Sequence, residues 1–317
     1  DEYIKKESLY GAKNYSPLSV VLEKGEGAYL WDVDGNKYLD MVSAYSAVSH
    51  GHSHPELLKT LHEQSSKLAV TSRAFYTEPF STFLEKLSKV SGFESILTMN
   101  TGAEAVETAI KAARRWGYFS KGIPEDKAEI IVANGNFHGR TTTIVSFSSD
   151  ASYKDGFGPF TPGFNSAEYC GSCDCQSIDS CLSIESFEKK INKNTCAILV
   201  EPIQGEAGIR VPTDGWLKQL SALCTSRNIL LILDEIQSGL GRTGKLFAYE
   251  HENIKPDGLI LGKALGGAIL PISAFLSSKE IMNHFNPGSH GSTFGGNPLA
   301  SKIAIKAIDL LFEEKLI

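Results

Sequence analysis

Two apolar runs, Ile229-Leu-Leu-Ile-Leu-Asp234-Glu235 and Gly258-Leu-Ile-Leu-Gly-Lys263, decide the fold of this chain. Each run has the length and the unbroken apolar character of a parallel strand that is buried on both faces. Each ends in a charged side chain, and the carboxyl ends of the strands form the edge at which open α/β sheets bind ligands. The two runs therefore predict a buried sheet that carries Asp234 and Lys263 at one edge.

A lysine and an aspartate at such an edge are the pair that pyridoxal phosphate, an aldehyde cofactor, requires. The lysine amine condenses with the aldehyde, and the aspartate keeps the nitrogen of the pyridine ring protonated so that the ring withdraws electrons. The ordinary alternative is a surface lysine that follows a strand. Lys263 therefore points to a cofactor only in combination with other features of the chain.

Strands alternate with helices along most of the sequence. We predict further strands at 95–99, 129–133, 143–147 and 196–201, and helices at 56–68, 103–118, 216–226 and 298–312. This alternation predicts an α/β fold with a mostly parallel, doubly wound sheet. Residues 16–40 alternate and turn, with Asp34-Gly35 at one turn, in the manner of a small antiparallel sheet.

The pattern also suggests a domain division. We expect residues 1–45 to belong to a smaller α+β domain, residues 46–300 to form the large cofactor-binding domain, and residues 301–317 to begin the C-terminal part of the small domain. The helix that starts at Pro298 is amphipathic, and no later element covers it. We therefore expect the natural protein to continue beyond Ile317.

The composition limits the possible partners. The chain has 317 residues, 42% of them hydrophobic, and a net charge of −6 with both signs interspersed. This charge argues against nucleic acid or an anionic membrane as the main partner. There is no apolar stretch of about twenty residues that could span a membrane. The first residues do not form a signal peptide, so we expect a cytoplasmic protein, with the mitochondrial matrix as the alternative.

Four of the six cysteines, Cys170, Cys173, Cys175 and Cys181, lie close together in a polar stretch. This stretch lacks the two separated C-x-x-C pairs that make a zinc site probable. We expect a cysteine-rich surface insertion with reduced thiols, and no metal. The other two cysteines have apolar neighbours and are expected in the core.

Two short segments could bind parts of a cofactor. Thr101-Gly102-Ala103-Glu104 joins a strand to a helix, so its free backbone N–H groups could bind a phosphate. The alternative is an ordinary capping box between Thr101 and Glu104. In the segment 136–141, Phe137 could stack on a flat ring and Arg140 could grip a carboxylate. In isolation a polar loop with one core phenylalanine is equally compatible with that segment.

Three other motifs have weaker functional interpretations. The carboxylates of Glu201 and Glu206 follow a strand and could orient a cation or an arginine, or be solvated loop charges. The glycines of 239–244 match the dinucleotide spacing, but they do not directly follow a strand, and Leu246 replaces the Ser or Thr of a P-loop. His50, His52 and His54 precede Pro55, so a turn that opens a helix is expected there and not a metal site.

Taken together, the motifs resemble those of the class III aminotransferases, which are fold-type I pyridoxal-phosphate enzymes, and within that family most resemble the members that act on ornithine. The matching segments cover nearly the whole chain. They are Trp31-Asp-Val-Asp-Gly35, Gly51-His-Ser-His-Pro55, Asn100-Thr-Gly-Ala-Glu-Ala105, Phe137-His-Gly-Arg-Thr141, Glu201-Pro-Ile-Gln-Gly-Glu206, Leu233-Asp-Glu-Ile-Gln237, Gly262-Lys-Ala-Leu265 and Gly291-Ser-Thr-Phe-Gly-Gly-Asn-Pro298.

The resemblance implies roles for individual residues. Lys263 would be covalently linked to the cofactor, and Asp234 would bind the pyridine nitrogen. The remaining cofactor-binding residues implied are Thr101, Gly102, Ala103, Phe137, Gln237, Ser292 and Thr293. Thr293 would reach the phosphate of a neighbouring subunit, so a homodimer with shared active sites is expected.

The resemblance also implies the substrates, ornithine and 2-oxoglutarate. Tyr15, Tyr45 and Arg140 would hold the α-amino and α-carboxylate ends of ornithine, and Glu206 would pair with an arginine beyond Ile317. His138 stands where some ornithine enzymes have tryptophan and where histidine is common in acetylornithine relatives. Enzymes acting on N-acetylornithine or 4-aminobutyrate therefore stay as alternatives, and a nucleotide-dependent enzyme or an inactive scaffold is a more distant one.

Overall fold

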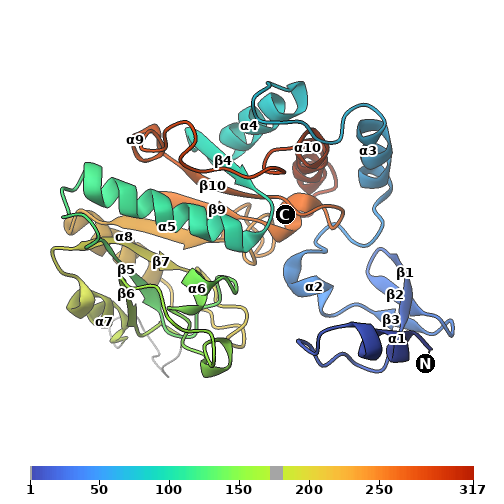
Figure 1. The fold of residues 1–317 in the computed structure, drawn as a ribbon, viewed down its shortest axis with the longest axis horizontal. Helices are drawn as coiled ribbons and strands as arrows, with labels where there is room; N and C mark the ends of the chain where they lie inside the picture. Colours follow the sequence, from blue (N-terminus) through green and yellow to red (C-terminus); the bar gives the residue numbers. More distant parts are fainter. Residues whose placement is uncertain (1, 172–180) are drawn as a thin grey trace.

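The computed structural model describes residues 2–171 and 181–317 and contains a seven-stranded sheet at its centre (Figure 1). In chain order the strands are β4 (Ser95–Met99), β5 (Glu129–Ala133), β6 (Phe164–Ala167), β7 (Thr195–Val200), β8 (Leu230–Asp234), β9 (Gly258–Leu261) and β10 (Ser273–Ser277). Their order across the sheet is β4-β10-β9-β8-β7-β5-β6. β10 is antiparallel to both of its neighbours and the pairs from β9 to β6 are parallel, as expected for a mostly parallel doubly wound sheet.

Both faces of the sheet are buried, because alternate residues of each strand point to opposite sides and both sets are apolar. In β8, Leu231 and Leu233 belong to one core cluster, while Leu230 and Ile232 belong to the other. This explains why the strands appear as unbroken apolar runs in the sequence.

Helices cover each face. The long helix α5 (Gly102–Phe119) crosses one face together with α6 (Thr142–Val145) and α9 (Lys279–Met282). The other face is covered by α4 (Glu78–Ser91), α7 (Ser183–Lys190), α8 (Trp216–Ser226) and α10 (Pro298–Glu313). α3 (Pro55–Ser65) packs on α10, and short 3₁₀ turns are η1 (Ala151–Tyr153), η3 (Ala248–Glu252) and η4 (Lys263–Gly266). No helix in the described ranges is long and apolar enough to cross a membrane.

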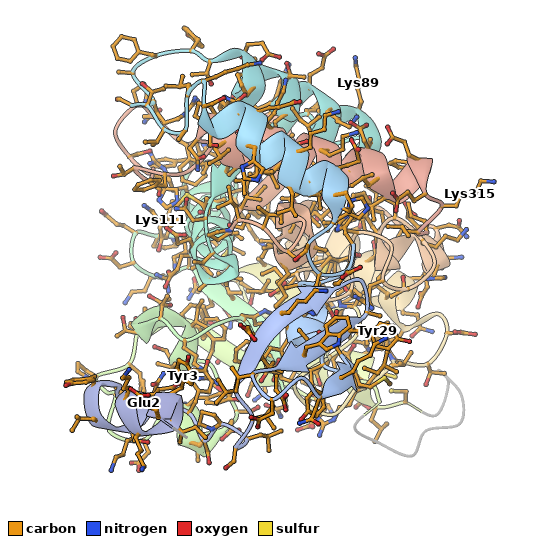
Figure 2. All side chains as sticks on the ribbon, turned by 90° about the vertical axis from the view of Figure 1, so that its right-hand side faces the viewer. Glu2, Tyr3, Tyr29, Lys89, Lys111 and Lys315 are labelled. Carbon is orange, nitrogen blue, oxygen red and sulfur yellow. The ribbon has the colours of Figure 1, made fainter. Side chains whose placement is uncertain are left out.

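The N-terminal segment forms the expected small antiparallel sheet. Its strands are β1 (Leu22–Glu26), β2 (Tyr29–Asp32) and β3 (Lys37–Leu39), and it is followed by the single turn α2 (Ser43–Ser46). The preceding helix α1 (Glu2–Tyr10) buries none of its residues. Figure 2 shows Glu2 and Tyr3 projecting from α1 at a corner of the molecule. This segment thus lies beside the main body and does not add to its core.

The structure corrects two expectations. Residues 143–147 were expected to be a strand, but Thr142–Val145 form α6. The hydroxyl of Thr141 accepts a hydrogen bond from Ile144 N at 3.2 Å, and Ile144 and Val145 are buried, so a side-chain cap and packing outweigh the strand preference of β-branched residues. The strands β6 and β10 were not predicted.

The second correction concerns the cysteines. Cys170 and Cys181, expected in a surface insertion, are instead buried in the same core cluster as Tyr169 and Phe187, because their small apolar side chains pack among those rings. Cys196 and Cys224 are in the core as predicted. Cys173 and Cys175 lie outside the described residues. Within the described ranges, no three His, Cys, Asp or Glu side chains are grouped to hold a metal.

Candidate active site

The carboxyl ends of five strands bring the predicted residues together. Gly102 follows β4, Phe137 follows β5, Glu201 follows β7, Asp234 ends β8 and Lys263 follows β9. They surround a cavity of about 180 Å³. It is lined by Gly102, Ala103, Phe137, His138, Gly139, Glu201, Ile203, Asp234, Ile236, Gln237 and Lys263. The edge predicted from two apolar runs is therefore the edge that carries this cavity.

Lys263 adopts a strained backbone conformation. Its φ is +42°, in the left-handed region that non-glycine residues rarely occupy. It stands between the end of β9 and the turn η4, so two ordered elements hold it there. Burial lowers the pKa of the Lys263 amine, while the charges of Asp234, Glu206 and Glu201 act against that shift. The amine forms no hydrogen bond or ion pair with any described residue, so it is available inside the cavity.

His138 is the site residue whose contact the sequence did not reveal. Its Nδ1 lies 2.7 Å from Oδ2 of Asp234, and both side chains are buried. Burial opposes a charge on the imidazole, but the hydrogen bond and charge of Asp234, helped by Glu201, outweigh it and raise the pKa of His138. The Oδ1 atom of Asp234 also accepts a hydrogen bond from Ile236 N at 3.0 Å. The carboxylate is thus fixed on two sides.

Glu201 is a second buried carboxyl group at the cavity. Only 5% of its surface is exposed, and its Oε2 accepts a hydrogen bond from Phe137 N at 3.2 Å. Burial raises the pKa of Glu201 to about 8, against the opposing influence of His138. This group therefore carries its proton at neutral pH, and the cavity holds fewer negative charges than its residue types suggest.

The N-terminus of α5 forms one wall of the cavity, and the capping box that the sequence offered there is present. Thr101 and Glu104 make the capping box: Thr101 Oγ1 accepts from Glu104 N at 3.2 Å, and Thr101 N donates to Glu104 Oε2 at 2.7 Å. The N–H groups of Gly102 and Ala103 precede the first helical hydrogen bonds, and both residues line the cavity. A Cβ on Gly102 would lie 2.7 Å from Cδ1 of Ile236, so a larger residue here would require the Ile236 side chain to move.

Two predicted residues lie at the border of this wall. Ser292 Oγ accepts a hydrogen bond from Asn100 Nδ2 at 2.8 Å, next to Thr101. Thr293 is exposed and does not line the cavity of its own subunit. Gln237 does line it, and its Nε2 donates to Oε1 of Glu206 at 3.0 Å.

The predicted substrate residues lie at the mouth. The guanidinium carbon of Arg140 is 5.8 Å from the ring centroid of Tyr15 and 5.8 Å from that of Phe137. Lys263 Nζ is 6.0 Å from the ring centroid of Tyr45, which belongs to a turn with left-handed backbone, its own φ being +57°. Arg140, Tyr15 and Tyr45 are exposed, so they surround the entrance and do not fill it.

The competing motifs do not form sites. His50, His52 and His54 contact three different groups, namely the carbonyl of Ala307, the carboxylate of Asp40 and the carboxylate of Glu314. Four residues separate the segment 239–244 from the end of β8, and the chain then leads into the 3₁₀ turn η3. The segment therefore does not open the helix that a dinucleotide site needs.

The cavity fits pyridoxal phosphate. It combines an unpaired lysine amine, a fixed aspartate, an aromatic wall at Phe137 and the N-terminus of an 18-residue helix. The Nε2 atom of His138 is buried without a partner in the described part of the chain, so it can still form a hydrogen bond with a bound group. These are the groups that an aldehyde, a pyridine nitrogen, a flat ring and a phosphate require.

A mostly parallel sheet with this lysine, aspartate and helix terminus at one edge defines the fold-type I pyridoxal-phosphate-dependent transferases. Within that class, the chain belongs to the class-III aminotransferase family, whose sequence model matches residues 10–317. The cofactor is pyridoxal 5'-phosphate, and the resemblance stated from the motifs is confirmed.

Individual relatives support this family assignment. An ornithine aminotransferase of Brevibacillus brevis is 54% identical over 314 residues, 99% of this chain and 76% of that protein. The structure of an ornithine aminotransferase from Toxoplasma gondii, with pyridoxal phosphate at partial occupancy in its active site, has a TM-score of 0.93 and 43% identity over 99% of this chain and 71% of that chain. An acetylornithine aminotransferase structure from Elizabethkingia anophelis has a TM-score of 0.86 and 52% identity over 99% of this chain and 74% of that chain.

Proposed function

We propose that this enzyme transfers the δ-amino group of ornithine to 2-oxoglutarate in a ping-pong reaction that gives glutamate-5-semialdehyde and glutamate. The observation that carries the proposal is the exposed Arg140 beside Tyr15 at the mouth of the Lys263 cavity. Similarity to enzymes that bear the name ornithine aminotransferase supports it. A cation at the entrance can hold the α-carboxylate while the distal amine reaches Lys263.

The residues of the chain have distinct roles in this proposal. When bound, pyridoxal phosphate withdraws electrons from the carbon that bears the transferred amine. Lys263 would hold the cofactor and would remove a proton from the δ-carbon of ornithine. Burial lowers the pKa of the Lys263 amine, and this direction suits a group that acts as a base. Asp234 keeps the pyridine nitrogen protonated, with His138 fixing its carboxylate.

The other assigned residues would bind and orient. Thr101, Gly102, Ala103 and Ser292 would hold the phosphate, Phe137 would stack on the ring, and Gln237 would lie at the ring hydroxyl. Tyr15, Tyr45 and Arg140 would hold the amino-acid end of ornithine. Glu206, which accepts a hydrogen bond from Gln237, would pair with an arginine beyond Ile317.

We further propose a homodimer in which Thr293 reaches the phosphate of the neighbouring subunit, supported by its exposure and its distance from the cavity of its own subunit. Residues 1–45 and 301–317 would belong to the small domain and residues 46–300 to the large one. Because the named relatives include enzymes of bacteria, we propose the cytoplasm as the compartment, with the mitochondrial matrix as the alternative.

N-Acetylornithine is the second candidate substrate. The Elizabethkingia anophelis relative named for it is 52% identical to this chain. The exposed phenol groups of Tyr15 and Tyr45 favour free ornithine, because a phenol can donate to or accept from a zwitterionic head group. Turnover of ornithine, N-acetylornithine and 4-aminobutyrate, measured side by side with 2-oxoglutarate, distinguishes these candidates.

The proposal is tested first at Lys263. We expect Lys263→Ala to abolish formation of glutamate-5-semialdehyde and the visible absorbance of the lysine-bound cofactor. Lys279→Ala, a substitution at a lysine at the start of α9 and away from the cavity, is the matched control and should keep both. Ornithine turnover at the normal rate by Lys263→Ala would rule the mechanism out.

A further inference from the structure

We propose that Tyr153 is a positioning residue: its ring holds the guanidinium of Arg140 in place to receive the α-carboxylate of the substrate. This inference rests on the proposed function, because it assumes that Arg140 binds that carboxylate. Tyr153 was not among the residues selected from the sequence. It lies 13 positions beyond Arg140 in a different element, the turn η1.

The contacts of Arg140 single out Tyr153. The guanidinium carbon of Arg140 is 4.8 Å from the ring centroid of Tyr153, nearer than the 5.8 Å to Tyr15 or to Phe137. Within residues 2–171 and 181–317, Arg140 makes no hydrogen bond and no ion pair. Aromatic rings are thus what confines this exposed side chain, and the ring of Tyr153 is the nearest.

Contact through ring faces suits a carboxylate-binding arginine. An aromatic ring attracts the cation through its π electrons and uses none of the N–H donors of the guanidinium. Those donors therefore stay free to form two parallel hydrogen bonds with a carboxylate. A neighbouring Asp or Glu would fix Arg140 equally well but would compete with the substrate.

Tyr153 is itself held in place independently of a ligand. Its ring packs edge-on against Phe137, with centroids 5.8 Å apart and planes at 69°. Its turn η1 is capped by Asp150, whose Oδ1 accepts from Ser152 N at 2.8 Å, and these hydrogen bonds from Ser152 lower the pKa of the Asp150 carboxyl. Tyr153 is half-buried, so its ring has few alternative positions.

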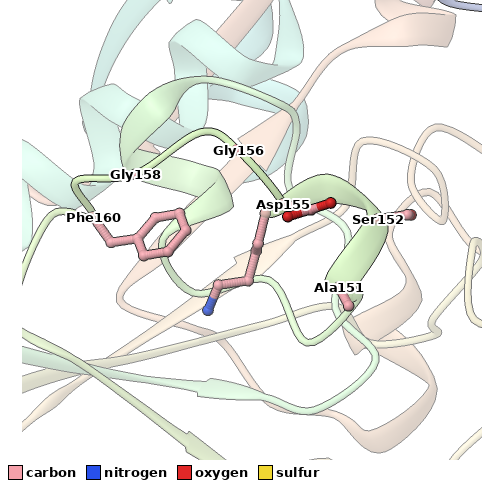
Figure 3. Close-up of a pocket in the computed structure, with 7 residues that line it drawn as sticks. Ala151, Ser152, Asp155, Gly156, Gly158 and Phe160 are labelled. Atoms are coloured by element: carbon pink, nitrogen blue, oxygen red, sulfur yellow. The ribbon is translucent and has the colours of Figure 1, made fainter.

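The chain just after Tyr153 is also anchored. Lys154 Nζ donates to the carbonyl of Ser146 at 3.3 Å and lies 4.9 Å from the ring centroid of Phe160. Figure 3 shows this loop, with Asp155 and Phe160 among the labelled residues that line its pocket. Tyr153 therefore links the wall that carries Phe137 to the arginine at the mouth.

The test compares Tyr153→Leu, which removes the ring, with Tyr153→Phe, which keeps it. For Tyr153→Leu we expect the KM for ornithine to rise by about 3- to 30-fold, the range that a cation–π contact supplies. The kcat and the cofactor absorbance should change little, and Tyr153→Phe should recover most of the affinity. Phe119→Leu, which removes the ring beside the guanidinium of Arg115 at the far end of α5, is the control and should leave the KM unchanged.

A competitor shows whether the effect passes through the carboxylate. 1,4-Diaminobutane resembles ornithine without its carboxylate, so its inhibition constant should not change in Tyr153→Leu. In an Arg140→Gln background, Tyr153→Leu should raise the KM no further, because the two residues act as one unit. An unchanged KM for ornithine, equal losses for ornithine and 1,4-diaminobutane, or full additivity with Arg140→Gln would overturn the inference.

Failure of the proposed function and failure of the role of Tyr153 give different results. If the unmodified enzyme does not turn over ornithine, the proposed function fails before Tyr153 is tested. If it does, and Tyr153→Leu behaves like the unmodified enzyme, the role of Tyr153 alone fails. Should Tyr153→Leu not fold, Tyr153→Met, which fills more of the ring volume, carries the same comparison.

Discussion

Asp234, Glu206 and Glu201 lie near the amine of Lys263, but these three carboxyl groups differ in burial and in hydrogen bonding. Asp234 is fixed by His138 and by a backbone N–H, whereas Glu206 faces Gln237 at the entrance. Glu201 is buried with one backbone donor, and burial raises its pKa to about 8. A neutral Glu201 leaves Asp234 as the main buried negative charge beside the cofactor site, which is where the proposed reaction needs it.

The raised pKa of Glu201 makes stability depend on pH. The unfolded chain releases this proton near pH 4.5 and the folded chain near pH 8, so folding takes up a proton between these values. The contribution to stability is therefore full below pH 4.5 and is lost as the pH rises towards 8. Because Gln is neutral at every pH, Glu201→Gln should gain stability relative to the unmodified protein by up to about 1.4 kcal/mol per pH unit in this interval.

Urea unfolding of the cofactor-free protein at pH 5, 6.5 and 8 measures this difference. Glu23→Gln, a substitution of an exposed glutamate in β1, is the control and should show no such slope. Parallel stability curves for Glu201→Gln and the unmodified protein would mean that Glu201 ionises normally in the fold.

At the scale of elements, the turn before α5 serves two purposes at once. The capping box of Thr101 and Glu104 uses side chains to satisfy the helix terminus, while the backbone N–H groups of Gly102 and Ala103 stay available. The helix packs on the sheet through Ala105, Val106 and Ala109, so the cap is placed accurately at the edge of β4. Thr101 and Glu104 therefore cap the helix, while Gly102 and Ala103 between them line the cavity.

Removing the cap should cost stability independently of the cofactor. We expect Thr101→Ala to lower the free energy of unfolding of the cofactor-free protein by about 1 kcal/mol, because Glu104 N loses its acceptor. Thr101→Ser keeps the hydroxyl and should restore nearly all of it. Chemical denaturation of the three proteins is the measurement, and equal stabilities of Thr101→Ala and Thr101→Ser would contradict the cap.

At the scale of the whole molecule, large apolar side chains are exposed near Thr293. Phe294 is 55% exposed, and in the segment before α4, Phe75 is 66% and Tyr76 97% exposed. The backbone hydrogen bond from Leu299 N to the carbonyl of Ala69 at 3.2 Å joins these two segments. Large exposed apolar side chains are typical of a protein interface, which supports the proposed dimer with shared sites.

Mixed dimers test whether the sites are shared. Lys263→Ala and Thr293→Ala are each expected to be defective, the first in chemistry and the second in cofactor affinity. In a mixed dimer, the site built on the intact Lys263 would receive the intact Thr293 from its partner. Co-refolding the two variants should therefore yield sites with normal cofactor affinity, measured by absorbance and ornithine turnover against each variant alone. No recovery in dimers shown to be mixed would place Thr293 in the site of its own chain.

The sequence by itself determined the sheet and the centre of the site. The unbroken apolar runs that became β8 and β9 are typical of strands buried on both faces. Parallel strands present their carboxyl ends at one edge, so the sequence predicted that Asp234 and Lys263 lie close together. The tertiary structure alone decided the pairing of His138 with Asp234, 96 positions apart, the neutral state of Glu201, and the place of Tyr153 over Arg140. It also decided that residues 142–145 are helical. These features depend on burial and on contacts between distant segments, and no local pattern encodes either.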